Sequence, residues 1–132
     1  MTGFSLKIVT PDGLVFDGIA EQLIVRTMSG DMGIMAKHVD SVSPLGMGGA
    51  TVVIEGKRRY AACMGGMVSV INGAVTLVPT TFEWAEDIDI ARAEASEKRA
   101  QAILANKNAS ETELKLAKSR LQRALVRKSV SK

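Results

Sequence analysis

The sequence predicts an antiparallel β-sandwich followed by a two-helix antiparallel hairpin, and three observations lead to this fold class. All twelve glycines and all three prolines lie within residues 1–84. That part alternates apolar and polar residues with the period of two that is typical of half-buried strands. Residues 85–132 contain ten alanines, no glycine and no proline, and their apolar residues recur with the period of a helix. We therefore expect a sandwich domain over residues 1–84 and a helical domain over residues 85–132.

The first domain is expected to contain eight to ten short strands. Phe4, Leu6 and Ile8 alternate with polar residues, and a turn at Pro11-Asp12-Gly13 ends this first strand. Asn72-Gly73, between two β-branched runs, is the strongest two-residue hairpin signal. No helical segment separates the strands, which disfavours a parallel sheet. The strands expected from these patterns are residues 4–8, 14–16, 22–28, 50–55, 57–64, 67–71, 74–78 and 80–84.

Two glycine-rich segments could suggest a phosphate-binding loop. Gly46-Met47-Gly48-Gly49 lacks the last glycine of the dinucleotide-binding motif, because position 51 is Thr51. We interpret this segment as a loop between strands and Gly65-Gly66 as a turn or bulge. The single cysteine, Cys63, lies in an expected strand and is predicted to be buried.

The second domain is expected to contain two helices. Residues 88–106 are strong helix formers, and acidic residues precede them where the helix dipole is positive. Asn106-Lys107-Asn108 supplies a turn, and Ser110 with Glu113 forms a capping box for a second helix over about 111–127. The apolar stripe of that second helix consists of Leu114, Ala117, Leu121, Ala124 and Leu125.

Alanines are expected to line the contact between the two helices. On the first helix we assign this contact to Ala91, Ala95, Ala102 and Ala105. Alanine allows close approach but buries little apolar area, at about 25 cal/mol per Å². We therefore expect a weakly held hairpin that is able to detach or extend.

The counts of cysteine and histidine exclude several kinds of site. One cysteine cannot form an internal disulfide or a Cys-rich zinc site, and one histidine excludes a His-based metal cluster, so no metal site is expected. Asp31 and His38 could suggest an acid–base pair, but no third member is identifiable and a local surface contact is favoured. No apolar run approaches the ~20 residues that span a bilayer, and the N-terminus lacks the pattern of a signal peptide. We expect a soluble, intracellular chain.

Charge is divided between the two domains. The formal net charge of +3 combines −1 for residues 1–84 with +4 for residues 85–132, and residues 114–132 contain seven bases and no acid. This basic helix suits an acidic partner, with a solvated face as the ordinary alternative. Nucleic acid is a third possibility, but aromatic residues for base stacking are nearly absent. The basic residues of this helix are Lys115, Lys118, Arg120, Arg123 and Arg127.

The first helix offers a candidate anion site. Its Asp89, Arg92, Ala93, Ser96 and Arg99 fall on one face at 100° per residue. Arginines bind phosphate oxygens, and small neighbours would leave room for a base or ribose. From spacing alone, an ordinary Asp–Arg surface pair is the favoured interpretation.

Four segments, in this order and spacing, resemble the ε subunit family of bacterial F-type ATP synthases, which corresponds to ε of chloroplasts and δ of mitochondria. They are residues 6–11, residues 30–34 with His38, Gly65-Gly66 with its strand, and residues 85–89. Two positions depart from the family pattern. Ala36 stands where the loop usually has proline, and Asp40-Ser41 replaces a usual Pro-Leu.

The resemblance implies a ten-stranded sandwich and a non-catalytic rotor subunit of the proton-translocating enzyme. The sandwich would bind the γ subunit and the membrane c-ring, with contacts at Ser29, Gly30, Asp31, Met32 and His38. The helical arm would inhibit ATP hydrolysis by reaching the catalytic α/β subunits, with the basic helix on the β subunit. The location implied is peripheral, on the cytoplasmic face of the bacterial plasma membrane, or on the stromal thylakoid face for a plastid chain. A free-standing ATP-sensing adaptor and a nucleic-acid binder remain the alternatives.

The resemblance also implies a regulatory ligand. Some bacterial members bind ATP through an I-D-x-x-R-A motif, which Ile88-Asp89-Ile90-Ala91-Arg92-Ala93 matches at every fixed position. No cofactor is required, and bound ATP would favour the compact hairpin. The implied ATP residues are Glu83, Ile88, Asp89, Arg92, Ala93, Arg99, Arg123 and Arg127.

Overall fold

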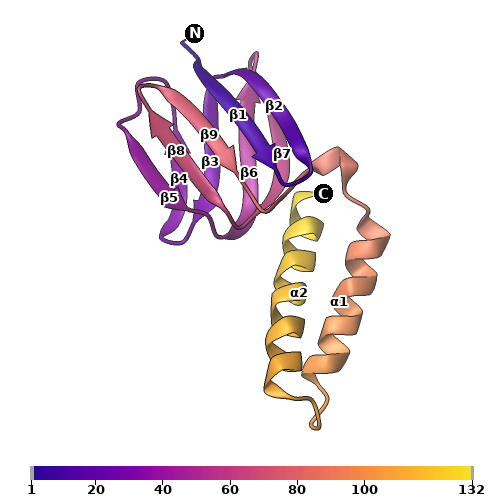
Figure 1. Cartoon of the computed structure of the whole chain (residues 1–132). Coiled ribbons are helices and arrows are strands. Elements are labelled where there is room, and N and C mark those ends of the chain that lie inside the picture. Colours follow the sequence, from indigo (N-terminus) through magenta and orange to yellow (C-terminus); the bar gives the residue numbers. More distant parts are fainter. Residues whose placement is uncertain (1, 132) are drawn as a thin grey trace.

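The computed structural model describes residues 2–131 as a β-sandwich from one end of which a helical hairpin projects (Figure 1). The first sheet has the order β2-β1-β9-β8-β5 and the second sheet the order β10-β7-β6-β3-β4. All strand pairs are antiparallel except β1 with β9. The predicted fold class is confirmed. The strands are β1 (Phe4–Thr10), β2 (Gly13–Ala20), β3 (Gln22–Thr27), β4 (Gly30–Ile34), β5 (Ser41–Pro44), β6 (Met47–Ile54), β7 (Lys57–Met64), β8 (Met67–Ile71), β9 (Ala74–Val78) and β10 (Thr81–Trp84).

The core of the sandwich lies between the inner faces of the two sheets. In β1, buried Phe4, Leu6 and Ile8 alternate with exposed residues, as the period of two predicts. Leu23 of the second sheet and Leu77 of the first sheet are fully buried against them. All members of this core except Leu45 belong to strands and none belongs to the hairpin, so the sandwich has a hydrophobic core that does not depend on the hairpin.

The tight turns follow the local chemistry of the sequence. Asn72 and Gly73 have φ of 50° and 80°, as a type I′ hairpin requires, and Glu55 and Gly56 repeat this geometry with 51° and 76°. Gly65-Gly66 forms the turn between β7 and β8, which confirms its assignment. Cys63 is buried as predicted.

The predicted strands were wrong or missing where glycines and other turn-forming residues occur within an extended backbone. Met47 to Gly49 was expected in a loop but begins β6, and β4 and β5 were not expected. Gly48 has a packing role, because a Cβ there would lie 2.7 Å from the Cβ of Arg26 on the neighbouring strand. A glycine chosen for close approach of strands looks, in the sequence, like a turn signal.

The hairpin consists of α1 (Ile90–Leu104) and α2 (Glu111–Val130), and a short 3₁₀ turn, η1 (Ala85–Asp87), joins it to β10. The Asp89 carboxylate caps α1 by accepting from the backbone N–H of Arg92 at 3.0 Å. Ser110 and Glu113 form the predicted capping box of α2, with both hydrogen bonds at 3.1 Å. The helices therefore begin where the sequence places caps.

The alanine assignment on α1 was wrong. Each helix contributes two buried alanines to the contact: Ala93 and Ala100 on α1, and Ala117 and Ala124 on α2. The four alanines that were assigned to the contact are exposed: Ala91, Ala95, Ala102 and Ala105. Alanine occupies two faces of α1, and only the partner helix decides between them. Leu125, expected in the stripe of α2, is 46% exposed.

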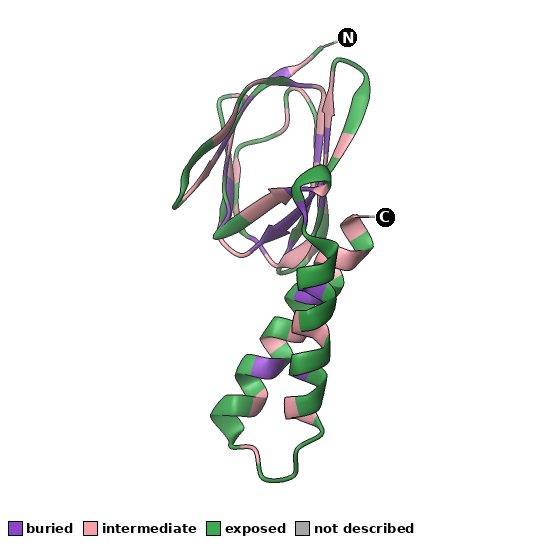
Figure 2. Cartoon of the chain, turned by 90° about the vertical axis from the view of Figure 1, so that its right-hand side faces the viewer, coloured by how far each residue is buried: buried purple, intermediate pink, exposed green. Residues whose placement is uncertain are grey.

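The end of α2 packs on the outer face of the second sheet. Val126 and Val130 lie against Ala62 and Met64 of β7, and the buried Ile88 completes this docking cluster. Gly49 leaves room for the contact, since a Cβ there would be 3.2 Å from Val130. Apart from this end and the alanine contact, the hairpin is mostly exposed (Figure 2).

Candidate functional site

The junction between sandwich and hairpin contains two ion pairs. Arg127 of α2 donates from Nε to the Glu83 carboxylate at 2.5 Å, and this contact is partly buried. On the other side of β10, the Arg59 guanidinium lies 3.7 Å from the ring centroid of Trp84 and donates to Glu86 at 2.5 Å. The hydrogen bond from Arg59 lowers the pKa of Glu86. The linker is thus held to β7 before the helix begins.

The residues of the I-D-x-x-R-A motif have structural contacts of their own. Ile88 belongs to the docking cluster, and Ala93 lies buried in the helix contact. Asp89 caps the helix through the backbone of Arg92. The motif therefore places the start of α1 and its arginine relative to the sandwich.

A third ion pair joins the two helices. Lys128 donates from Nζ to Glu97 at 2.7 Å, and their side chains are 33% and 15% exposed. This hydrogen bond raises the pKa of Lys128. Because a helical side chain leans toward the N-terminus of its own helix, Glu97 and Lys128 reach toward each other along the antiparallel contact.

The buried alanines, seven residues apart on each helix, face each other when Ala93 lies opposite Ala124 and Ala100 opposite Ala117. In this alignment Arg92 is level with the turn of α2 between Arg123 and Arg127, and Arg99 lies about 10 Å farther from the sandwich, at about 1.5 Å per residue.

Five arginines share one side of the hairpin. At 100° per residue, those of α1 lie about a third of a turn from the helix contact, and those of α2 about a quarter of a turn. Because the helices are antiparallel, both displacements lead to the same side. Only Arg127 of this group forms an ion pair within residues 2–131, and Lys115 and Lys118 face other directions. The group, called the arginine side below, consists of Arg92, Arg99, Arg120, Arg123 and Arg127.

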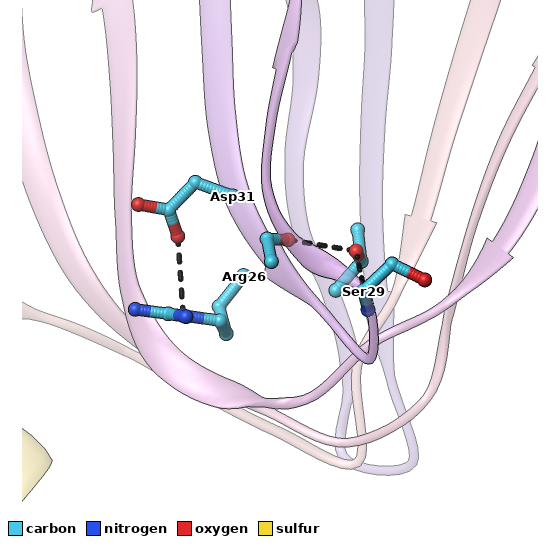
Figure 3. A network of polar contacts seen from close by, with 5 residues as sticks. Arg26, Ser29 and Asp31 are labelled. Carbon is cyan, nitrogen blue, oxygen red and sulfur yellow. Dashed lines mark hydrogen bonds and ion pairs between the residues drawn. The ribbon is translucent and has the colours of Figure 1, made fainter.

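The turn between β3 and β4 is a compact polar structure (Figure 3). Thr27 donates from Oγ1 to the carbonyl of Gly30 at 2.7 Å and accepts from the N–H of Ser29 at 3.2 Å. Arg26 and Asp31, opposite each other on the two strands, form an ion pair at 3.1 Å. Met28 protrudes from this turn with 73% exposure.

His38 lies away from this turn. It follows β4, whereas Ser29 and Gly30 precede or begin that strand. Its Nδ1 donates to the carbonyl of Val39 at 2.7 Å, since a carbonyl can only accept. The adjoining loop is fixed by Asp40, which accepts from the N–H of Asn72. The structure thus separates His38 from Asp31 and brings no acid–base pair together.

On its outer face, the β9-β8-β5 part of the first sheet is apolar and free within residues 2–131, whereas β1 and β2 carry Lys7 and Asp17 there. Sequence reasoning missed this surface, although apolar residues at both alternating positions of β8 and β9 are its signal. Met67 and Val78 are opposite each other in the register, with neutral Ser69 and Thr76 beside them. Exposed apolar patches of this kind mark docking surfaces. Its large apolar members, called the apolar face below, are Val42, Met67, Ile71 and Val78.

The described residues contain no cluster of three His, Cys, Asp or Glu side chains that could hold a metal ion. Within the same range, no helix combines the length and apolar character needed to cross a bilayer. A sandwich with one free apolar face and a hairpin docked by its last turns is the architecture of a subunit that acts by docking within a larger assembly.

Comparison with known proteins identifies that assembly. Residues 3–85 match the family described as ATP synthase, Delta/Epsilon chain, beta-sandwich domain, and residues 86–132 match its long alpha-helix domain. The chain belongs to the ATP synthase delta/epsilon chain family and is a non-catalytic subunit of that enzyme complex. The family resemblance predicted from the sequence is confirmed.

Relatives span the whole chain. The ATP synthase epsilon chain of Shouchella clausii is 38% identical over 132 residues, 100% of this chain and 97% of its own. That of Bacillus velezensis is 40% identical over 131 residues, with 99% and 98% covered. A chain from the Euglena gracilis mitochondrial ATP synthase structure of OSCP, F1 and c-ring has the same fold, with a TM-score of 0.86 at 21% identity, over 98% of this chain and 81% of its own.

Proposed function

We propose that this chain is a central-stalk subunit that couples the γ subunit to the membrane c-ring and regulates ATP hydrolysis through its helical arm. The observation that supports it best is the division of the two outer sheet faces. The end of α2 occupies part of the second sheet, whereas the apolar face of the first sheet is free. A subunit held permanently by γ needs such an apolar surface.

The β3–β4 turn is the proposed c-ring contact. Its hydrogen bonds and the Arg26–Asp31 ion pair hold Ser29, Gly30 and Asp31 in place, and the exposed Met28 adds apolar contact area. Met32, also expected at this contact, instead packs partly against the sandwich core. His38, near the opposite end of β4, would contact γ together with the apolar face. In this role the chain is peripheral, at the cytoplasmic face of the bacterial plasma membrane, and binds no nucleic acid.

The arm is the proposed regulatory element. Its arginine side would meet acidic surface on the catalytic α/β subunits when the arm extends, and Lys115 and Lys118 would add contacts on other faces of α2. Deleting residues 88–132 removes the arm but leaves the core of the sandwich complete. We therefore expect the reassembled synthase to hydrolyse ATP faster while retaining γ and the c-ring. Unchanged hydrolysis in the assembled deletion variant would contradict an inhibitory arm.

We also propose that the arginine side binds ATP when the hairpin is compact. Arg92, Arg123 and Arg127 lie at one level for a polyphosphate, near Glu83, and Arg99 lies about two turns farther from the sandwich. Phosphate would compete with Glu83 for Arg127. ATP shifts the arm only by its difference in affinity between compact and extended forms.

Calorimetry tests this ligand. We expect the isolated chain to bind ATP and Arg92→Ala to weaken binding by about tenfold or more, because a charge-assisted contact contributes about 1.5–3 kcal/mol. Lys107→Met at the exposed hairpin turn removes the same charge and should leave the affinity unchanged. Absence of heat with the wild-type chain would exclude ATP binding without touching the rotor role. Purification with α, β and γ subunits tests that role separately and distinguishes it from a free-standing sensor.

A further inference from the structure

The contact between α1 and α2 offers little to fix how the helices slide along each other. Its buried residues are Ala93 and Ala100 on one helix and Ala117 and Ala124 on the other. Methyl groups form no deep ridges and grooves, so several alignments bury similar area. The chain joins the helices at the hairpin turn, and at the other end Ile88 packs with Val126 and Val130. Between these ends, polar side chains must fix the alignment of the two helices.

Lys128 lies in the last turn of α2, beside the sandwich, and pairs with Glu97 at the middle of α1. Theirs is the one ion pair between α1 and α2 within the described range 2–131. Glu97 is 15% exposed, so little water competes for its carboxylate. An ion pair within an apolar contact acts chiefly by specifying alignment, since a slipped helix leaves a charge unpaired.

We propose that the Glu97–Lys128 pair is a positioning element that fixes how far α2 slides along α1 and so sets the level of Arg123 and Arg127 against Arg92 and Arg99. Lys128 follows Arg127 directly, so its pairing with α1 orients the arginine beside it. At 100° per residue Lys128 points into the helix contact, about a quarter of a turn from the arginine side, and it does not contact the ligand. The effect on ATP rests on the proposed nucleotide site; the alignment of the two helices does not.

ATP affinity tests the positioning role through four variants measured by calorimetry. Lys128→Met and Glu97→Met each leave one charge unpaired, and each should weaken ATP binding by about fivefold to tenfold. The charge exchange Glu97→Lys with Lys128→Glu restores the pair and should return the affinity to within about twofold of wild type. Lys98→Met, on the exposed outer side of α1, matches the charge change of Lys128→Met and should have no effect. Circular dichroism verifies that each variant is helical.

A distance between the helices provides a readout without ATP. Spin labels at Gln101→Cys and Gln122→Cys lie on exposed positions of the two helices. Burial raises the pKa of the Cys63 thiol to about 12, so this native cysteine stays protonated and unlabelled. Each single Met variant should broaden the distribution of interspin distances or shift its mean by about 5 Å, one helical turn. The charge exchange should restore the wild-type distribution.

The outcomes separate the inference from the proposed ligand. Weaker ATP binding in Lys128→Met alone, without an effect of Glu97→Met or recovery on exchange, would show a direct phosphate contact and overturn the positioning role. If the wild-type chain bound no ATP, the proposed nucleotide site would be excluded, and the spin-label distance alone would test the positioning role. Unchanged distances in both single variants would then overturn the positioning role, whereas a change in both with recovery on exchange would support it.

Discussion

Gly66→Ala is expected to destabilise the sandwich by about 2–5 kcal/mol. A Cβ at this position would lie 2.0 Å from the carbonyl oxygen of Val78 and 2.7 Å from the Cα of Pro79. Both are backbone atoms, so the strands around the β7–β8 turn would have to separate, at about 1–3 kcal/mol for overpacking. The φ of 93° adds strain of about 1–2 kcal/mol for a residue with a Cβ. Urea unfolding, followed by the fluorescence of the single Trp84, measures the loss.

Gly73→Ala is the matched control for this prediction. Gly73 also has positive φ, 80°, but nothing lies within 4 Å of a Cβ added there. Gly73→Ala should lower the free energy of unfolding only by the strain of the left-handed backbone, about 1–2 kcal/mol. Equal losses of stability in the two variants would show that backbone strain alone, without the clash against β9, explains why position 66 needs glycine. The comparison therefore separates a turn glycine from a packing glycine.

The sequence determined the parts of the fold that depend on local chemistry. The capping box of α2 and the Asn72-Gly73 hairpin formed as predicted, because each needs only neighbouring residues. The strand β4 escaped prediction because its glycines, Gly30 and Gly33, suggest a loop while pairing with β3 imposes extension. Contacts between distant segments decide such cases.

The sequence predicted which residues belong to the candidate site but not how they are arranged. The family motifs located Asp89 and Arg92, yet the caps and docking contacts of these residues appear only in the structure. Glu97 and Lys128 resemble ordinary surface charges at a separation of 31 residues. Likewise, the spacing of alanines on α1 could not show which face meets α2. Residues whose role is to align two elements have no local signal.

Val126→Asp is expected to release the arm from the sandwich. Val126 packs against Ala62, Met64 and Ile88, and a carboxylate there would be desolvated among apolar groups, near the negative end of the helix dipole. Burying a polar group without a partner costs about 1–3 kcal/mol, which would shift the docking equilibrium by about tenfold to a hundredfold. The sandwich core contains no residue of α2, so its stability should change little.

Small-angle scattering and hydrogen exchange measure this release. We expect a larger radius of gyration and faster exchange in the last turns of α2, with β-strand protection retained. Leu125→Asp is the matched control, because it introduces the same charge one residue away at a position that is 46% exposed. If both variants released the arm equally, added negative charge near the arginine side would be the cause. Release by Val126→Asp alone would establish that the apolar contact with β7 holds the arm compact, and ATP would then act on an arm already held at this end.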